Sequence, residues 1–178
     1  MAQASACAIS VSTHKLKKRR ARGQRAKTPG QKSARQRELT TKLRGELAEL
    51  EFLLKATHLG FIVAKPYGDS RRYDFIVDSG KFRWRVQVKC STSLLNGLYR
   101  FNAHRRTTRG VVPYDPSEVD FMAAYVMPEN AWFIIPITVA CLRTSLLICP
   151  RHWPRDDRRY SHYREAWHLL RQEDGISF

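Results

Sequence analysis

The sequence predicts an α+β fold, with one domain preceded by a basic tail. Three observations support this. A helical pattern at residues 40–58 comes first, several short strand patterns follow, and a second helical pattern at 160–171 closes the chain. The chain has 178 residues and is 43% hydrophobic, which is enough for a core without disulfide or metal staples. We therefore place a tail at 1–38 and a folded domain at 39–178.

The tail is the most basic part of the chain. The formal net charge is +16, and residues 1–37 hold eleven Lys and Arg residues and no acid. Its Lys, Arg, Gln, Ser and Ala content predicts disorder. The tail is either a solvated extension or an arm that binds phosphates without sequence preference. Such charge favours a polyanionic partner, nucleic acid or an acidic membrane surface.

No apolar run approaches the roughly 18 residues of a membrane span, and no secretory pattern begins the chain. The four cysteines form no C-x-x-C pair, which favours a reducing compartment. We expect a cytoplasmic protein, associated with the nucleoid, that does not bind membranes. No Gly-rich phosphate loop occurs, so we expect no nucleotide cofactor.

The first helix begins at Thr40 or Thr41, either of which can cap it. Its leucines recur at helical spacing and predict one buried stripe: Leu43, Leu47, Leu50 and Leu54.

Three strands follow, at 61–65, 72–77 and 82–90. The third alternates cleanly, so Gln87 and Lys89 share one face and Val86 and Val88 the other. Further strands are predicted at 98–103, 120–126 and 132–136, with a basic loop at 104–110. Residues 160–171 are predicted to form a closing helix.

Asp74 stands inside an otherwise apolar strand, which is costly unless its carboxylate is paired or binds a cation. If the second and third strands form a hairpin, Asp74, Gln87 and Lys89 converge on one patch. Carboxylate and amide oxygens suit Mg²⁺, and a lysine can polarise water or offset charge on phosphorus. Taken alone, this pattern is weak, and an Asp in an ion pair with a surface Lys nearby is the commoner explanation for it. The helix offers a further carboxylate, Glu46 or Glu49.

Several ordered blocks then carry a resemblance. They are GELAE at 45–49, AKPYGD at 64–69, RYDFIV at 72–77, RVQVK at 85–89, DFMAAYV at 120–126, FIIP at 133–136 and YREAWHL at 163–169. In this order they resemble the PD-(D/E)XK homing endonucleases associated with group I introns. The resemblance covers about residues 42–170 and leaves out the tail. It implies a restriction-endonuclease-like mixed sheet flanked by helices.

The resemblance also implies residue roles. Glu49, with Glu46 as a possible neighbour, matches the helix carboxylate, Asp74 the central metal ligand, Gln87 the position that is acidic in the wider superfamily, and Lys89 the motif lysine. All four would be catalytic, and Glu49, Asp74 and Gln87 would bind Mg²⁺, with Mn²⁺ as a substitute. The implied activity is site-specific hydrolysis of double-stranded DNA by a homodimer or homotetramer.

Five basic residues are candidates for DNA contact: Lys65, Arg85, Arg105, Arg106 and Arg109. Arginine binds phosphate or guanine bidentately. The alternative for the loop arginines is a solvated loop, and for Arg85 an ion pair with Asp78 or Glu51.

Other functions remain open at this stage. A Holliday-junction resolvase or a restriction-type nuclease would share the core. A degenerate nuclease that only binds DNA is favoured by the neutral Gln87. An RNA-binding protein would account for the tail but not for Asp74 and Lys89.

Overall fold

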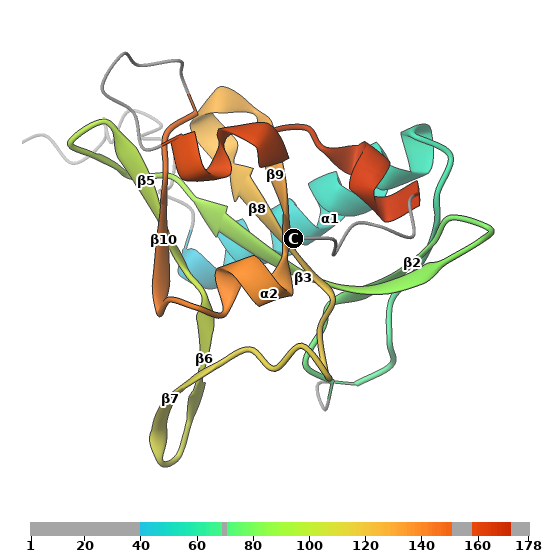
Figure 1. Ribbon diagram of the computed structural model, residues 1–178, viewed down its shortest axis with the longest axis horizontal. Helices are drawn as coiled ribbons and strands as arrows, with labels where there is room; N and C mark the ends of the chain where they lie inside the picture. The colour runs from blue at the N-terminus through green and yellow to red at the C-terminus, as the bar shows by residue number, and fades with distance from the viewer. Residues whose placement is uncertain (1–39, 69–70, 151–157, 172–178) are drawn as a thin grey trace, which may run out of the picture. The chain divides into compact units, whose positions relative to one another are not determined.

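The structure, a computed structural model, describes residues 40–68, 71–150 and 158–171. The predicted tail at 1–38 lies outside these ranges. The described elements, in chain order, are α1 (Thr41–His58), β1 (Ile62–Ala64), β2 (Phe75–Asp78), β3 (Arg83–Ser91), β4 (Leu94–Leu95), β5 (Leu98–Asn102), β6 (His104–Thr107), β7 (Gly110–Pro113), β8 (Phe121–Val126), η1 (Met127–Glu129), β9 (Ala131–Pro136), α2 (Ile137–Ala140), β10 (Ser145–Ile148), η2 (Arg158–Tyr163) and η3 (Trp167–Arg171). Figure 1 follows this order by colour.

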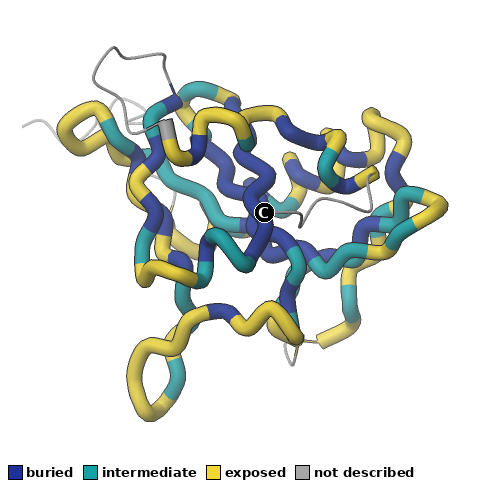
Figure 2. The backbone as a smooth tube through the Cα atoms, viewed as in Figure 1, coloured by how far each residue is buried: buried dark blue, intermediate teal, exposed yellow. Residues whose placement is uncertain are grey.

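A five-stranded mixed sheet organises the domain, in the order β1-β2-β3-β8-β9. Strands β3 and β8 are parallel, and the other neighbours in this sheet are antiparallel. All residues of β8 and β9 are buried, as the dark central strands of Figure 2 show. These strands are continuous apolar runs because both sheet faces are covered. The mixed sheet and the α+β class are as predicted.

Helix α1 covers one face of this sheet, and Thr40 caps it by accepting a hydrogen bond from the Leu43 amide at 3.2 Å. The side chains that it buries are Ala48, Phe52 and Ala56. The predicted leucine stripe is therefore wrong, because Leu50 is 61% exposed and Leu54 53%. Phe52 stacks on Phe75 and contacts the rings of two tryptophans, so aromatic packing decides which helix face turns inward.

The opposite sheet face packs against a smaller three-stranded sheet, in the order β10-β5-β4, together with helix α2. Alternate residues of β8 divide between the two cores: Phe121, Ala123 and Tyr125 face α1, whereas Met122, Ala124 and Val126 face the smaller sheet. Strand β3 alternates in the same way, with Val86 and Val88 in the α1 core, as predicted.

The predicted closing helix at 160–171 is wrong: two 3-10 segments, η2 and η3, occupy this region. Glu165, between them, has a φ of 49°. Its side chain accepts hydrogen bonds from the Trp132 amide and the Trp167 indole, both at 2.9 Å. These bonds anchor the break in a left-handed conformation that an α-helix cannot contain.

The predicted basic loop is a β-hairpin instead. Strands β6 and β7 pair antiparallel around Thr108 and Arg109, with Arg105 opposite Val112 and Arg106 opposite Val111. Figure 1 shows this hairpin projecting away from the sheets, and Figure 2 shows that most of it is exposed. Within the described ranges, no helix is long and apolar enough to cross a bilayer.

Candidate active site

Asp74 lies directly before β2, rather than inside a strand as predicted. Its amide donates to the Val86 carbonyl at 2.9 Å, which continues the β2–β3 ladder by one residue. Its carboxylate accepts hydrogen bonds from the Val88 amide at 2.7 Å and from Nε2 of Gln87. The antiparallel β2–β3 register therefore brings Asp74 against Gln87, the convergence that the sequence predicted.

The Asp74 carboxylate is poorly hydrated. The pKa of Asp74 is raised from its ordinary value of 3.8 to about 6, mainly by burial and also by the nearby charge of Glu49. The hydrogen bond from Val88 and the positive charges of Lys89 and Lys65 oppose this rise. Such a carboxylate gains from a bound cation, which would restore its ionised form at low cost.

Gln87 is polar yet buried within the described part of the chain, with 8% of its surface exposed. Its Nε2 donates to Asp74 and to the Val88 carbonyl, the latter at 3.2 Å. Both bonds use the amide nitrogen, so the amide oxygen is the atom with which Gln87 would bind a metal.

Lys89 follows on the same face of β3. Its Nζ lies 5.6 Å from the centre of the Tyr114 ring, and its charge acts on Asp74. Tyr114 is buried and comes directly after β7. The segment that leaves the β6–β7 hairpin therefore contacts Lys89 through one aromatic side chain.

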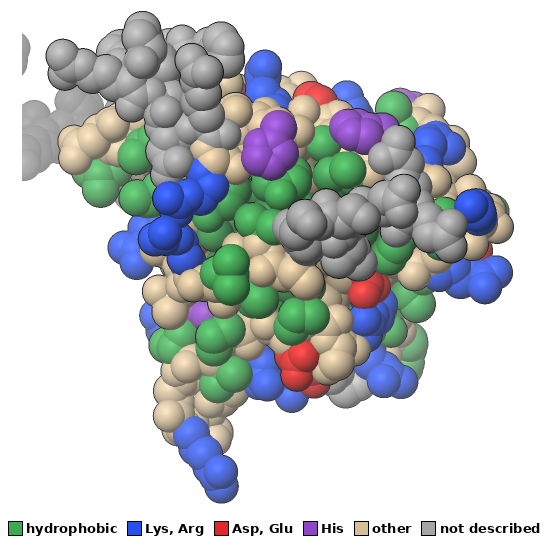
Figure 3. Space-filling view, viewed as in Figure 1, with side chains coloured by type: hydrophobic (Ala, Val, Ile, Leu, Met, Phe, Trp, Pro, Cys, Tyr) green, Lys and Arg blue, Asp and Glu red, His purple; other side chains and the backbone are tan. Residues whose placement is uncertain are grey.

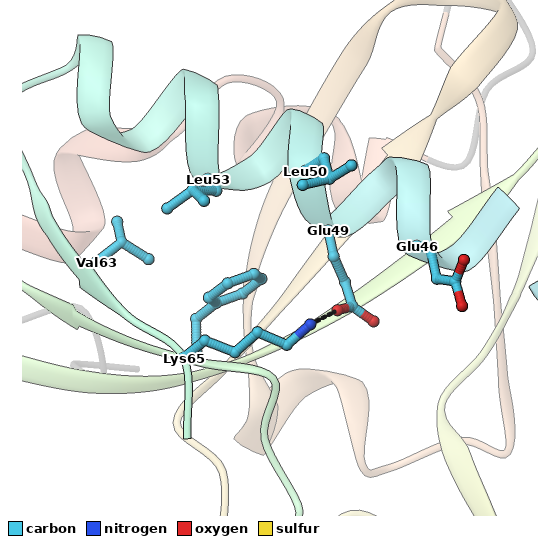
Figure 4. Close-up of a pocket in the computed structure, with 7 residues that line it drawn as sticks. Glu46, Glu49, Leu50, Leu53, Val63 and Lys65 are labelled. Atoms are coloured by element: carbon cyan, nitrogen blue, oxygen red, sulfur yellow. Dashed lines mark hydrogen bonds and ion pairs between the residues drawn. The ribbon is translucent and has the colours of Figure 1, made fainter. Parts of the chain in front are cut away.

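Of the two glutamates predicted on α1, Glu49 is the one that interacts electrostatically with Asp74. It accepts a hydrogen bond from Lys65 Nζ at 2.7 Å and is 26% exposed. Glu46 is 55% exposed, pairs with Lys42 at 3.8 Å, and points away from Lys65 in Figure 4. Of the two, Glu49 is the one whose charge acts on Asp74, which favours Glu49 as the third acidic or amide side chain of the site.

A pocket of about 350 Å³ opens beside the Lys65–Glu49 pair. Its apolar wall comes from α1, β1 and β2, and its polar edge from Glu46, Glu49 and Lys65 (Figure 4). Two of these charged residues, Glu49 and Lys65, also act on Asp74 through their charge.

The side-chain oxygens of Asp74, Glu49 and Gln87 are suited to a hard divalent cation. Two carboxylates and an amide oxygen are ligands that Mg²⁺ and Mn²⁺ accept. Among the described residues, no group of three His, Cys, Asp or Glu side chains could hold a metal. A metal bound beside Asp74 and Glu49 would therefore need a ligand of another kind, and the Gln87 oxygen is the candidate.

The hairpin arginines differ in exposure. Arg106 and Arg109 are exposed, whereas Arg105 is half-buried, with its Nε enclosed and without a hydrogen-bond partner. Basic side chains mark the far end of the hairpin in Figure 3. A two-stranded ribbon of this kind fits the major groove of DNA.

Arg85 is occupied within the fold. Its guanidinium donates to both oxygens of Asp120, at 2.7 and 3.0 Å, and to the Ser117 and Pro116 carbonyls. The hydrogen bond to Asp120 raises the pKa of Arg85. Arg85 therefore anchors the turn before β8, and nothing in this arrangement favours its predicted contact with DNA. Arg83 pairs with Asp78 at 2.8 Å.

Comparison with known proteins now decides the family. The sequence pattern of the PD-(D/E)XK endonucleases matches residues 39–170. The chain belongs to this family. No curated protein sequence matches the chain.

The structure of a bacterial homing endonuclease, I-Ssp6803I, is similar to this PD-(D/E)XK endonuclease. The two are 30% identical and superpose with a TM-score of 0.68, over 78% of this chain and 97% of that chain. The crystal structure of MepB is similar at 11% identity and a TM-score of 0.37, over 68% of this chain and 93% of that chain. The second likeness is too low to add to the assignment.

The sequence predicted that Asp74 and Gln87 lie together, and the β2–β3 pair brings them into contact. Two other contacts were not predicted. The Lys65–Glu49 pair joins residues 16 apart, and no pattern in either segment indicates the contact. Tyr114 follows a hairpin whose sequence has the pattern of a loop, so nothing local indicates its position next to Lys89.

Proposed function

We propose that this PD-(D/E)XK endonuclease is a metal-dependent, site-specific enzyme that cleaves double-stranded DNA, of the homing type associated with group I introns. The observation that carries the proposal is the Asp74–Gln87 contact, with Lys89 on the same strand face and Glu49 in electrostatic range. The likeness to a homing endonuclease favours the homing type over the resolvase and restriction types.

Each side chain has a role that follows from its chemistry. Asp74, Glu49 and the Gln87 oxygen would hold Mg²⁺ or Mn²⁺. The ion, when bound, would lower the pKa of water and offset charge on the departing 3′ oxygen. Lys89 would orient the attacking water or stabilise the charge that develops on the phosphoryl oxygens. The Tyr114 ring would hold the Lys89 ammonium in place through a cation–π contact.

DNA contact would come from the β6–β7 hairpin and from Lys65. Arg106 and Arg109 are exposed on the hairpin, and Lys65 is 63% exposed beside the carboxylates. The described part of one chain carries one such group of residues, and a duplex has two strands of opposite direction. A homodimer or homotetramer would present paired sites related by symmetry.

Cleavage of a pooled, randomised duplex library in Mg²⁺ tests the proposal. The wild type should give discrete cuts, and the Lys89→Ala and Asp74→Ala variants should give none while still binding DNA. Cuts confined to branched DNA, without sequence preference, would favour a resolvase. A folded wild type that binds DNA but does not cleave in Mg²⁺ or Mn²⁺ would favour the degenerate binder.

A further inference from the structure

Lys65 places a positive charge among the groups assigned to the metal. Its Nζ donates to Glu49 Oε2 at 2.7 Å, and its charge also acts on Asp74. The hydrogen bond to Glu49 raises the pKa of Lys65, as do the charges of Glu49, Asp74 and Glu46. Lys65 thus interacts with both carboxylates that the proposed function gives to a divalent ion.

The two partners differ in their freedom to move. The Lys65 side chain is 63% exposed and that of Glu49 is 26% exposed. Lysine has a flexible four-carbon stem, whereas the shorter Glu49 side chain projects from α1 and lines the pocket (Figure 4). If the pair separates, the ammonium is therefore the group that moves into solvent.

We propose that Lys65 neutralises Glu49 in the metal-free protein, competes with a divalent cation for that carboxylate, and so sets the metal affinity of the site. This inference rests on the proposed metal dependence. An ammonium and a divalent cation at the same carboxylate repel each other, so binding of the metal must displace Lys65 or bear its repulsion.

Direct metal binding tests the inference without any need for cleavage. MnCl₂ is titrated into the chelator-treated full-length chain in a calorimeter, at fixed low ionic strength and without DNA. Lys65→Gln should bind Mn²⁺ roughly three- to tenfold more tightly than wild type, because a neighbouring positive charge is gone. Lys65→Arg retains the charge and should bind no more tightly than wild type.

Lys42→Gln is the matched control. Lys42 also pairs with a glutamate of α1, Glu46, but at 3.8 Å, and the charges that shift the pKa of Asp74 are those of Glu49, Lys89 and Lys65 instead. The affinity of the Lys42→Gln variant for Mn²⁺ should stay within about twofold of wild type, because exposed charges are screened by solvent and salt. Thermal melts in chelator establish that each variant is folded before titration.

The outcomes separate this inference from the proposed function. If wild type and Lys65→Gln bind Mn²⁺ equally, Lys65 does not compete and the inference alone is overturned. If Lys42→Gln gains affinity and Lys65→Gln does not, Glu46 is the metal carboxylate and the inference is again overturned. If no variant binds Mn²⁺, the proposed metal dependence fails, and the inference with it.

Discussion

Nε2 of Gln87 donates a hydrogen bond to the Asp74 carboxylate across the β2–β3 pair. A neutral amide thus stands where a second carboxylate would repel Asp74. Asp74 is already poorly hydrated, with its pKa at about 6. The amide keeps the metal-free site stable and still presents an oxygen to a cation.

Gln87→Glu should destabilise the metal-free protein and make its stability depend on metal. The change removes the donor to Asp74 and adds a like charge, at a cost of about 1–3 kcal/mol. Thermal melts at pH 8 should show a lower Tm in chelator and recovery in excess Mn²⁺. Gln87→Leu, which adds no charge or ligand, should lose stability without recovery in Mn²⁺. An unchanged Tm of Gln87→Glu in chelator would contradict this role of the amide.

Asp74 should make the metal-free fold less stable as pH rises. The folded-state pKa of about 6 lies above the ordinary 3.8, so the folded state binds this proton more tightly than the unfolded state. Stability from this group is complete below the unfolded pKa and is lost between about pH 4 and 6. The loss reaches at most about 3 kcal/mol.

The comparison with Asp74→Asn isolates this effect, because asparagine can accept the Val88 hydrogen bond and does not titrate. In chelator, the variant should gain stability relative to wild type as pH rises from 4 to 7, measured by urea denaturation. Parallel curves for the two proteins over this range would argue against a poorly hydrated Asp74.

The contact between the candidate residues Asp74 and Gln87 could be predicted from the sequence because spacing within strands is local. Alternation along residues 82–90 separates Gln87 and Lys89 from Val86 and Val88, and a short turn forces the antiparallel pairing with the Asp74 segment. The mixed sheet and its assignment to the nuclease family required the ordered blocks together, since no single block is specific.

Helix faces and the chain end were predicted poorly, because distant packing decides them. Leu50 and Leu54 satisfy helical periodicity, yet Phe52 is the residue with aromatic partners in the sheet and in η3. Glu165 interrupts the last helical pattern because Trp132 and Trp167 supply hydrogen bonds from outside it. Neither partner is visible within a local window of sequence.

Arg106 should contribute to DNA sequence preference and Arg105 should not. Arg106 shares a hairpin face with exposed Val111, whereas Arg105 is half-buried opposite Val112. Arg106→Ala should relax the preference at one base pair by about 1–3 kcal/mol, as expected for loss of an arginine–guanine contact. Selection of bound sequences from a random library, for each variant, measures this.

Cleavage by Arg106→Ala should persist on an optimal site at high enzyme concentration, because Arg106 is not one of the proposed catalytic residues. An Arg105→Ala profile that loses preference while Arg106→Ala retains it would reverse the assignment of the two hairpin faces.

Arg85→Ala should lower stability rather than alter DNA recognition. Arg85 bonds both oxygens of Asp120 and two carbonyls of the preceding turn, and the Asp120 side chain is only 16% exposed. Removing Arg85 leaves that carboxylate half-buried without its cation. Because the Arg85 side chain is itself 32% exposed, solvent screening reduces the cost to about 2 kcal/mol.

Urea denaturation measures this loss, and Arg83→Ala on the same strand is the control. Arg83 is 76% exposed in its pair with Asp78, so its removal should change stability by less than about 1 kcal/mol. Under conditions where Arg85→Ala is folded, the salt dependence of DNA binding should match wild type, since no phosphate contact has been removed. A shallower salt dependence with normal stability would restore Arg85 to the DNA interface.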